Sequence, residues 1–135
     1  MRLVVDTNVL MSALFFGGVP GRVLEGVRRR QWQLVATPAI LAEYRRIVGD
    51  LGTQFPGVDA SAVVEVLAAS AILVPDRKPP SPICSDPADD MFLLCAADGR
   101  AAAVVTGDRA LLRVGAFEGV PVLTVRQWLD RSGRT

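Results

Sequence analysis

Met-Arg-Leu-Val-Val-Asp-Thr-Asn-Val-Leu, residues 1–10, is the stretch that decides the fold. Its apolar run, Leu3 to Val5, is typical of a central strand in a parallel sheet, buried on both faces. The run ends at Asp6, and open α/β sheets hold their ligands at the carboxyl ends of such strands. Asp6 also suits the N-cap of a helix that begins at Asn8. Whether other carboxylates reach the same edge decides between these two roles.

Composition limits the possible chemistry. The chain has 135 residues, half of them apolar, which predicts one folded domain over residues 1–135 rather than disorder. Its 15 basic and 14 acidic residues nearly balance, so bulk charge predicts no partner. The absence of His excludes Ser-His-Asp triads and His-ligated zinc. Two cysteines, Cys84 and Cys95, favour a reduced, cytoplasmic protein, and no run is long enough to span a membrane.

Short apolar runs alternate with helical patterns along the rest of the chain. This alternation predicts an α/β fold with a mainly parallel sheet and helices on both of its faces. Further strands are predicted at 34–36, 71–74, 102–105 and 120–123. Helices are predicted at 8–16, 20–31, 38–49, 59–69, 86–98, 109–114 and 125–130. The remaining segments are expected to be a loop at 49–56, an extended proline-rich connector at 77–82 and a frayed tail at 131–135.

Acidic residues occupy several positions that point toward one edge of this sheet. Asp108 follows the strand at 102–105, just as Asp6 follows the first strand, so the two should meet. Glu43 lies at the margin of an apolar helical stripe rather than on its solvated side. In a helix starting at Asp86, the carboxylates of Asp86, Asp89 and Asp90 share a wedge of about 100° that also contains apolar residues. Three acids in one turn repel one another, and a cation would remove the conflict.

The chemistry that follows from such a cluster is specific. Carboxylates without His or paired Cys form an oxygen-only site, which suits Mg²⁺ or Mn²⁺. Such a metal, partly hydrated and in contact with phosphate oxygens, supports hydrolysis of phosphodiesters by an activated water. The residues therefore predict a metal-dependent phosphodiesterase.

The chain resembles the PIN-domain nucleases, and in particular the VapC-like toxins of bacterial toxin–antitoxin modules. The resemblance covers nearly the whole chain and rests on four segments in a fixed order. These are Val-Val-Asp-Thr-Asn-Val-Leu at 4–10, Ala-Ile-Leu-Ala-Glu-Tyr at 39–44, Asp-Pro-Ala-Asp-Asp-Met-Phe-Leu at 86–93 and Val-Val-Thr-Gly-Asp at 104–108.

The resemblance implies a three-layer α/β/α domain with a four- or five-stranded parallel sheet. It implies Mg²⁺- or Mn²⁺-dependent cleavage of single-stranded RNA by a homodimer that a cognate antitoxin protein silences. The family's acids fall on Asp6, Glu43, Asp89 or Asp90, and Asp108, as catalytic and metal-holding residues. The family's usual spacing to the last acid selects Asp90, which is preferred, while a subgroup pattern selects Asp89. Asn8 and Thr106 match positions that orient the carboxylates.

Several arginines are candidates for contacts with the RNA backbone. The alternative is that Arg28 to Arg30 simply complement the dipole at a helix C-terminus. The candidates for phosphate contact are Arg22, Arg28, Arg29, Arg30, Arg45 and Arg46.

Other functions fit less well. A phosphatase of the haloacid dehalogenase type would use Asp6 as nucleophile, but it needs a second Asp where this chain has Asn8. It also needs a placed lysine, as a receiver-like domain does, and the sole lysine, Lys78, lies in the proline-rich connector. The main alternative is a PIN fold that binds RNA or a protein without catalysis, and the retention of all four acids argues against it.

Overall fold

The sheet is built around β1 (Arg2–Val5), whose last three residues are almost completely buried. It pairs in parallel with β2 (Gln33–Ala36) on one side and with β4 (Ala103–Val105) on the other. The computed structural model describes residues 1–133. Within them the strand order is β3-β2-β1-β4-β6-β5. The outer strands are β3 (Ile72–Leu73), β5 (Ala116–Phe117) and β6 (Val120–Leu123).

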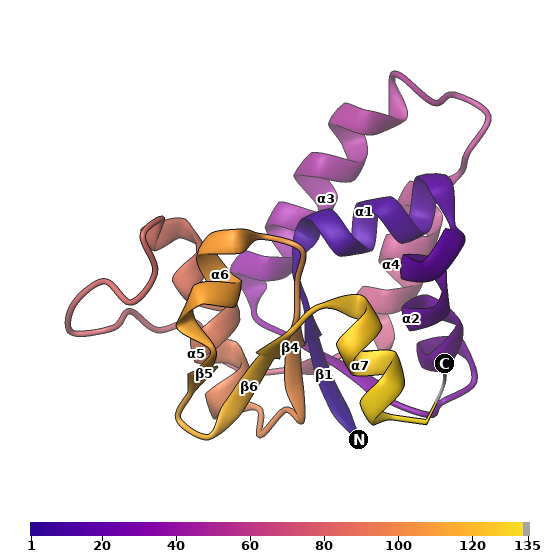
Figure 1. Cartoon of the computed structure of the whole chain (residues 1–135). Helices are drawn as coiled ribbons and strands as arrows, with labels where there is room; N and C mark the ends of the chain where they lie inside the picture. Colours follow the sequence, from indigo (N-terminus) through magenta and orange to yellow (C-terminus); the bar gives the residue numbers. More distant parts are fainter. Residues whose placement is uncertain (134–135) are drawn as a thin grey trace.

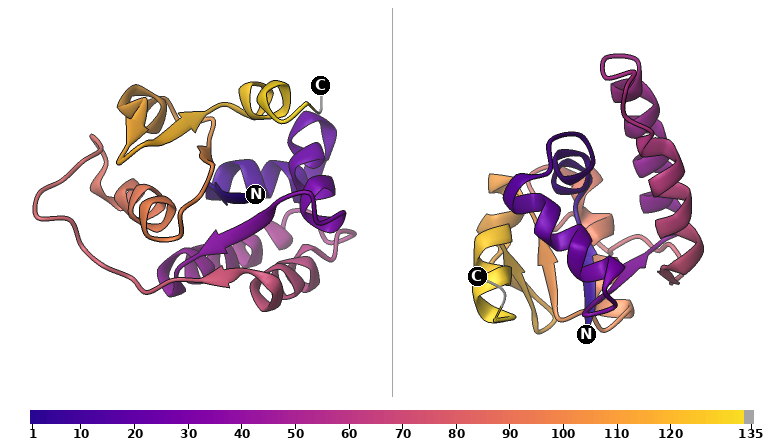
Figure 2. Two further views of the ribbon diagram at one scale, coloured as in Figure 1. Left: turned by 90° about the horizontal axis from the view of Figure 1, so that it is seen from below. Right: turned by 90° about the vertical axis from the view of Figure 1, so that its right-hand side faces the viewer.

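Helices cover both faces of the sheet, so the predicted α/β/α architecture is confirmed. One face packs against α5, which contacts β1, β2 and β4, and the other carries α7, which contacts β4, β6 and α2 (Figure 1; Figure 2, left). The helices are α1 (Thr7–Phe16), α2 (Gly18–Arg28), α3 (Pro38–Gly52), α4 (Ala60–Ser70), α5 (Asp90–Asp98), α6 (Arg109–Val114) and α7 (Val125–Arg131).

Two tryptophans close the core on the α2 and α7 side. The rings of Trp32 and Trp128 meet edge to face, with centroids 5.4 Å apart. The indole nitrogen of Trp32 donates to the Val23 carbonyl at 2.9 Å. A Cβ added to Gly26 would lie 2.0 Å from the Trp32 ring, so only glycine fits at that point of α2. This packing joins α2 to α7, and α2 also packs against α1.

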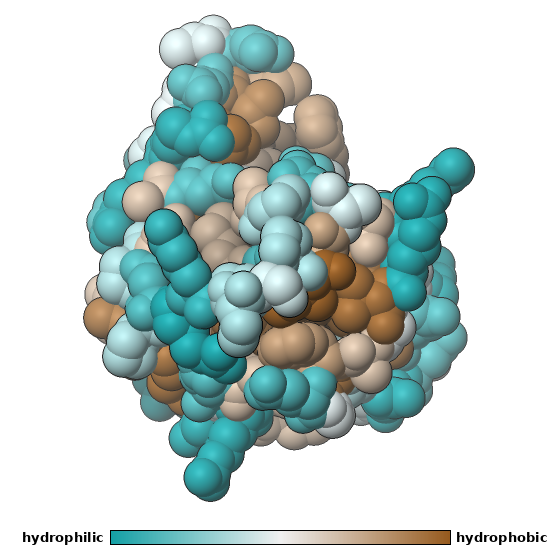
Figure 3. Space-filling view, turned by 90° about the vertical axis from the view of Figure 1, so that its left-hand side faces the viewer, coloured by the Kyte–Doolittle hydropathy of each residue, from teal (hydrophilic) through white to brown (hydrophobic). Residues whose placement is uncertain are grey.

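The helices α3 and α4 pair with each other, and their connected ends project from the body as an arm (Figure 1; Figure 2, right). In the space-filling view the arm stands at the top, with hydrophobic residues between hydrophilic ones (Figure 3). The sequence placed a loop from residue 49, whereas α3 continues to Gly52 because Val48 and Leu51 still pack on the core side.

One strand was missing from the sequence prediction. The sheet has a sixth, antiparallel strand, β5, which pairs with β6 through a tight hairpin. Its turn residues Glu118 and Gly119 both have positive φ, 48° and 82°, as two-residue hairpins with a matching twist require. The strand is two residues long, too short to leave a periodic pattern in the sequence.

The predicted helix at 86–98 is also wrong in its first turn. A 3₁₀ turn, η1 (Pro87–Asp89), comes first, and α5 begins only at Asp90. Asp86 caps the turn through the backbone N–H of Ala88, at 3.0 Å. The change of helical period separates the three carboxylates that a single helix would have placed in one wedge: Asp86 is exposed, Asp89 half-buried and Asp90 buried.

Two further sequence predictions concern a membrane-spanning segment and the C-terminal tail. Among residues 1–133, no helix is long and apolar enough to cross a membrane. The tail at 131–135 was expected to fray, but Arg131 still belongs to α7, and Arg134 and Thr135 lie outside the described residues.

Candidate active site

Asp6 combines the two roles that the sequence left open. Its side chain caps α1, accepting the backbone N–H of Val9 at 2.8 Å, and it stands at the carboxyl end of β1. The hydroxyl of Thr106 donates to its other carboxylate oxygen. Asp6 is only 3% exposed, and burial raises its pKa against the lowering effect of these hydrogen bonds, with the charge of Asp108 raising it further. The carboxylate is thus fixed in place and held at an energetic cost.

Asp108 reaches the same edge from the neighbouring strand β4. Its backbone N–H donates to the Thr106 hydroxyl oxygen at 2.9 Å, and its carboxylate caps α6 through Ala110 at 2.8 Å. Thr106 therefore links both aspartates, donating to Asp6 and accepting from Asp108. These contacts hold both aspartates in place, and the role expected for Thr106 in orienting site carboxylates stays a prediction.

Asp89 joins this pair from η1. Partial burial raises its pKa to about 7, together with a hydrogen bond shared with Asp108 and the negative charges of Asp108, Asp86 and Asp6. The contribution of Asp108 indicates that the two carboxylates repel one another when both are charged. Asp6, Asp89 and Asp108, from distant parts of the chain, thus lie near one another at the edge of the sheet where β1 and β4 end, although they do not form a three-residue metal cluster.

Asp90 is placed differently from its neighbour. It is 2% exposed, and its carboxylate accepts the backbone N–H groups of Ile83 at 3.1 Å and Cys84 at 2.8 Å. It therefore anchors the end of the proline-rich connector to the start of α5. The spacing argument that preferred Asp90 as a site residue gains no support from this geometry.

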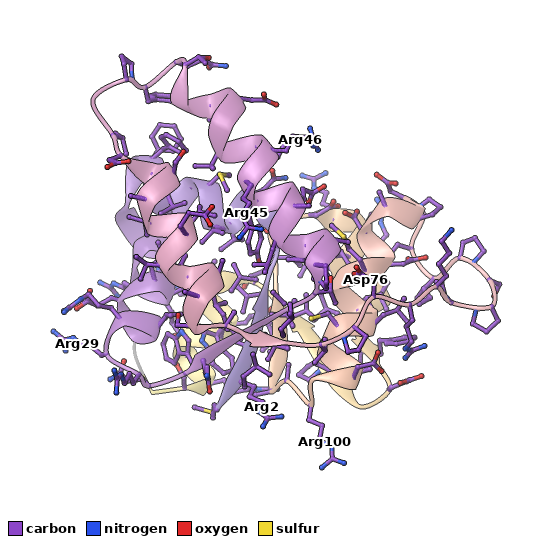
Figure 4. All side chains as sticks on the ribbon, turned by 180° about the vertical axis from the view of Figure 1, so that it is seen from behind. Arg2, Arg29, Arg45, Arg46, Asp76 and Arg100 are labelled. Atoms are coloured by element: carbon purple, nitrogen blue, oxygen red, sulfur yellow. The ribbon has the colours of Figure 1, made fainter. Side chains whose placement is uncertain are left out.

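Glu43 faces the site from α3. The hydroxyl of Thr7 donates to its carboxylate, and the guanidinium of Arg46, which is labelled on α3 in Figure 4, lies 3.8 Å away. The next residue, Tyr44, is buried, and its hydroxyl donates to the carbonyl of Val5. Burial raises the pKa of Tyr44 well above its usual value, and the charges of Asp6 and Glu43 add to this, so both carboxylates lie near the ring.

Sequence reasoning missed Thr7 and Tyr44. A signal was present for each: Thr7 directly follows Asp6, and a tyrosine in an apolar stripe needs a partner for its hydroxyl. For Asn8, expected to orient the carboxylates, the structure gives no such bond among residues 1–133, and its exposed side chain lines a groove beside Asp108.

The arginines proposed for RNA contact are mostly paired with acids. Arg28 and Arg29 both reach Glu25, at 2.5 and 2.9 Å. Arg45, which is labelled in Figure 4, pairs with Glu65 at 2.9 Å across α3 and α4. Within residues 1–133, by contrast, no arginine or lysine lies within 4.0 Å of Asp6, Asp89 or Asp108.

The carboxylates at this edge can be compared with the ligands that a divalent cation requires. They are hard oxygen donors, and among residues 1–133 no arginine or lysine lies within 4.0 Å of Asp89 to neutralise its charge. No three His, Cys, Asp or Glu side chains among residues 1–133 lie together closely enough to hold a metal by themselves. Mg²⁺ usually keeps several waters and needs only one or two carboxylates. The Asp89 and Asp108 pair, with Asp6 beside it, therefore fits a hydrated Mg²⁺ or Mn²⁺.

Of two grooves on the part of the surface formed by residues 1–133, one adjoins the carboxylates. A groove of about 570 Å³ begins at Thr106 and Asp108 and passes along α1. A larger, mostly apolar one of about 1090 Å³ lies between α2 and α4. It contains none of the clustered aspartates, so its size does not indicate the reaction site.

Comparison with known proteins identifies the family. The family model described as "PIN domain" matches residues 2–110, so the chain belongs to the PIN domain family, whose members are in general nucleases. The fold is similar to that in the crystal structure of PAE2754 from Pyrobaculum aerophilum, with a TM-score of 0.61 and 15% identity. That likeness covers all of this chain and 91% of the other, and at this identity it shows the fold alone. The chain has no match among curated proteins.

Proposed function

We propose that this chain is a Mg²⁺- or Mn²⁺-dependent endoribonuclease that cleaves single-stranded RNA. The observation that supports the proposal is the nearness of Asp6, Asp89 and Asp108 at one edge of the sheet, with no arginine or lysine within 4.0 Å of them among residues 1–133. A bound divalent ion would neutralise this charge, activate water and polarise the phosphate that is attacked.

In this proposal each acidic residue has a separate role. Asp89 and Asp108 would hold the metal, which would supply an activated water, and Asp6, fixed by Val9 and Thr106, would orient that water. Glu43, restrained by Thr7, faces the site from α3 and positions water on that side. Asp90 shapes the site indirectly because it fixes the connector that precedes η1.

The biological role belongs to the same proposal. The likeness to VapC-like toxins supports a homodimeric, cytoplasmic toxin that a cognate antitoxin protein inhibits at the acidic edge. Both cysteines are free and buried, and burial raises the pKa of each to about 12, so neither thiol is reactive. This agrees with a reducing compartment.

The test is cleavage of a fluorescently labelled, unstructured oligoribonucleotide by the purified chain. We expect cleavage in Mn²⁺ or Mg²⁺, none in EDTA, and none with Asp108→Asn. Asp98→Asn is the matched control, since Asp98 pairs with Arg77 away from the site at 2.8 Å. A wild-type protein that binds this RNA without cutting it in Mn²⁺ would instead support the non-catalytic binding module.

A further inference from the structure

The groove beside Asp108 has features that the proposed cleavage reaction does not use. It runs from Thr106 and Asp108 past α1 to the start of α7, and its volume of about 570 Å³ is within the range of small-molecule sites. On α1 it is lined by Asn8 and Ser12, which are one turn apart and therefore on the same face. The groove is thus continuous with the site and is large enough for one nucleotide.

The walls of this groove differ in polarity. One part is apolar, formed by Val19 and Pro20 at the start of α2 and by Val125 at the start of α7. Polar side chains complete it, among them Asn8 and Thr124. A nucleotide has the same division, with a flat base that packs on apolar surface and a sugar and phosphate that need polar partners. No aromatic ring lines the groove, so base stacking, and with it strong base preference, is not expected.

Arg126 ends the groove and lacks a structural explanation. It lies in the first turn of α7, where the helix dipole disfavours a positive charge. Among residues 1–133, no carboxylate lies within 4.0 Å of its guanidinium, whereas Arg28 and Arg45 are paired with acids. An exposed cation in an unfavourable position on the wall of a groove is available for an anion.

We infer that this groove is the subsite for the nucleotide adjacent to the cleaved phosphodiester, with its phosphate on Arg126 and its base on Val19 and Pro20. The inference rests on the proposed function, because the scissile phosphate is taken to lie at Asp89 and Asp108. It makes Arg126 a positioning residue for the substrate. It also predicts the path of the RNA across the surface, from the carboxylates over α1 toward α7.

The test compares two substrates of different length. Bis(p-nitrophenyl) phosphate has a scissile phosphodiester and no neighbouring nucleotide, whereas an oligoribonucleotide fills the groove. Arg126→Gln should lower kcat/KM for the oligoribonucleotide about tenfold, mainly through KM, and leave hydrolysis of the small ester unchanged. Arg131→Gln, at the other end of α7, is the control and should affect neither substrate.

A binding measurement separates this inference from the proposed function. Fluorescence anisotropy of a labelled oligoribonucleotide in EDTA, over a range of salt, does not depend on catalysis. Arg126→Gln should weaken binding and reduce the slope of log K against log salt by about 0.7, the value for one phosphate contact on a single strand. An unchanged slope and unchanged KM would overturn the subsite. Failure of the wild type to hydrolyse either substrate would overturn the proposed function, whereas a reduced salt slope for Arg126→Gln would still support a phosphate contact at Arg126.

Discussion

Acidic residues in two regions of this molecule are treated in opposite ways. On the outer helices they are neutralised: Glu25 contacts two arginines, Glu65 pairs with Arg45, and Asp98 pairs with Arg77. At the edge where β1 and β4 end, Asp6, Asp89 and Asp108 have no arginine or lysine within 4.0 Å among residues 1–133.

This difference in neutralisation indicates which carboxylates of the fold are available to bind a positively charged ligand. Pairs on the outer helices are exposed, so they contribute little to stability and are screened by salt. The carboxylates at the sheet edge are partly or fully desolvated and crowd one another, which destabilises the metal-free protein. A folded chain keeps such a cluster only if something other than stability requires it, and a divalent cation meets that requirement.

The largest effect is expected at Asp6 and its hydrogen-bond partner. Asp6→Asn keeps the cap on Val9 but removes the charge, so RNA cleavage in Mn²⁺ should fall by more than about 100-fold, or about 2.7 kcal/mol in barrier height. Thr106→Val removes the bond that orients Asp6, and the loss should be smaller, about 10–100-fold. Initial rates on a labelled oligoribonucleotide measure both, with circular dichroism to check folding. Equal cleavage rates for the wild type, Asp6→Asn and Thr106→Val would show that the carboxylates at the sheet edge have no special role in cleavage.

The adjacent residues Asp89 and Asp90 should respond in opposite directions. Asp90→Asn leaves one of the two backbone N–H groups at Ile83 and Cys84 facing an amide donor, so unfolding free energy should fall by about 1–3 kcal/mol. Asp89→Asn in EDTA at pH 7.5 should instead raise stability, because it removes a repelling charge. Urea denaturation of both variants decides this, and destabilisation by Asp89→Asn would show that crowding is absent.

The raised pKa values at the sheet edge also predict the direction in which the stability of the metal-free protein changes with pH. The pKa of Asp89 is raised to about 7 in the folded protein, from an ordinary value of 3.8. The folded state therefore binds this proton more tightly than the unfolded state, so the metal-free protein loses stability as pH rises from about 4 to about 7. Asp6, with its raised pKa, acts in the same direction.

Urea denaturation in EDTA at pH 4.5 and 7.5 measures this dependence. The stability advantage of Asp89→Asn over the wild type should be present at pH 7.5 and shrink toward zero at pH 4.5. The opposite trend, with the advantage growing in acid, would mean that Asp89 is ionised more easily in the folded protein than in the unfolded one.

The smallest effect is expected on the outer helices. Glu65→Gln breaks the exposed pair with Arg45, so thermal unfolding should shift only slightly and RNA cleavage should be unchanged. Raising the salt concentration should make even this shift disappear. A large loss of stability would show that the arm formed by α3 and α4 depends on this pair.

Much of the fold was predictable because the chain marks its elements clearly. Buried runs such as Leu3–Val5 and caps such as Thr37 and Thr124 are local signals, and the structure has the corresponding strand and helices. The two-residue strand β5 could not be predicted, since it depends on two positive φ angles at Glu118 and Gly119 rather than on a hydrophobic pattern.

The site was predictable in part for similar reasons. That Asp6 and Asp108 share an edge follows from a parallel sheet, but their direct proximity requires β1 and β4 to be neighbours, which no local pattern specifies. The choice between Asp89 and Asp90 depends on one 3₁₀ turn before α5. The assignment of the site residues stays a prediction, and it is the variants above that test it.

The most direct test of the central claim is calorimetric titration of Mn²⁺ into the metal-free protein. Wild type and Asp98→Asn should bind Mn²⁺ with the same affinity, while Asp108→Asn, which keeps its helix cap, should bind it at least tenfold more weakly. Near pH 7, binding should also release protons from Asp89, seen as a dependence of the heat on the buffer. Equal affinities in all three proteins, or no binding by the wild type, would contradict the account.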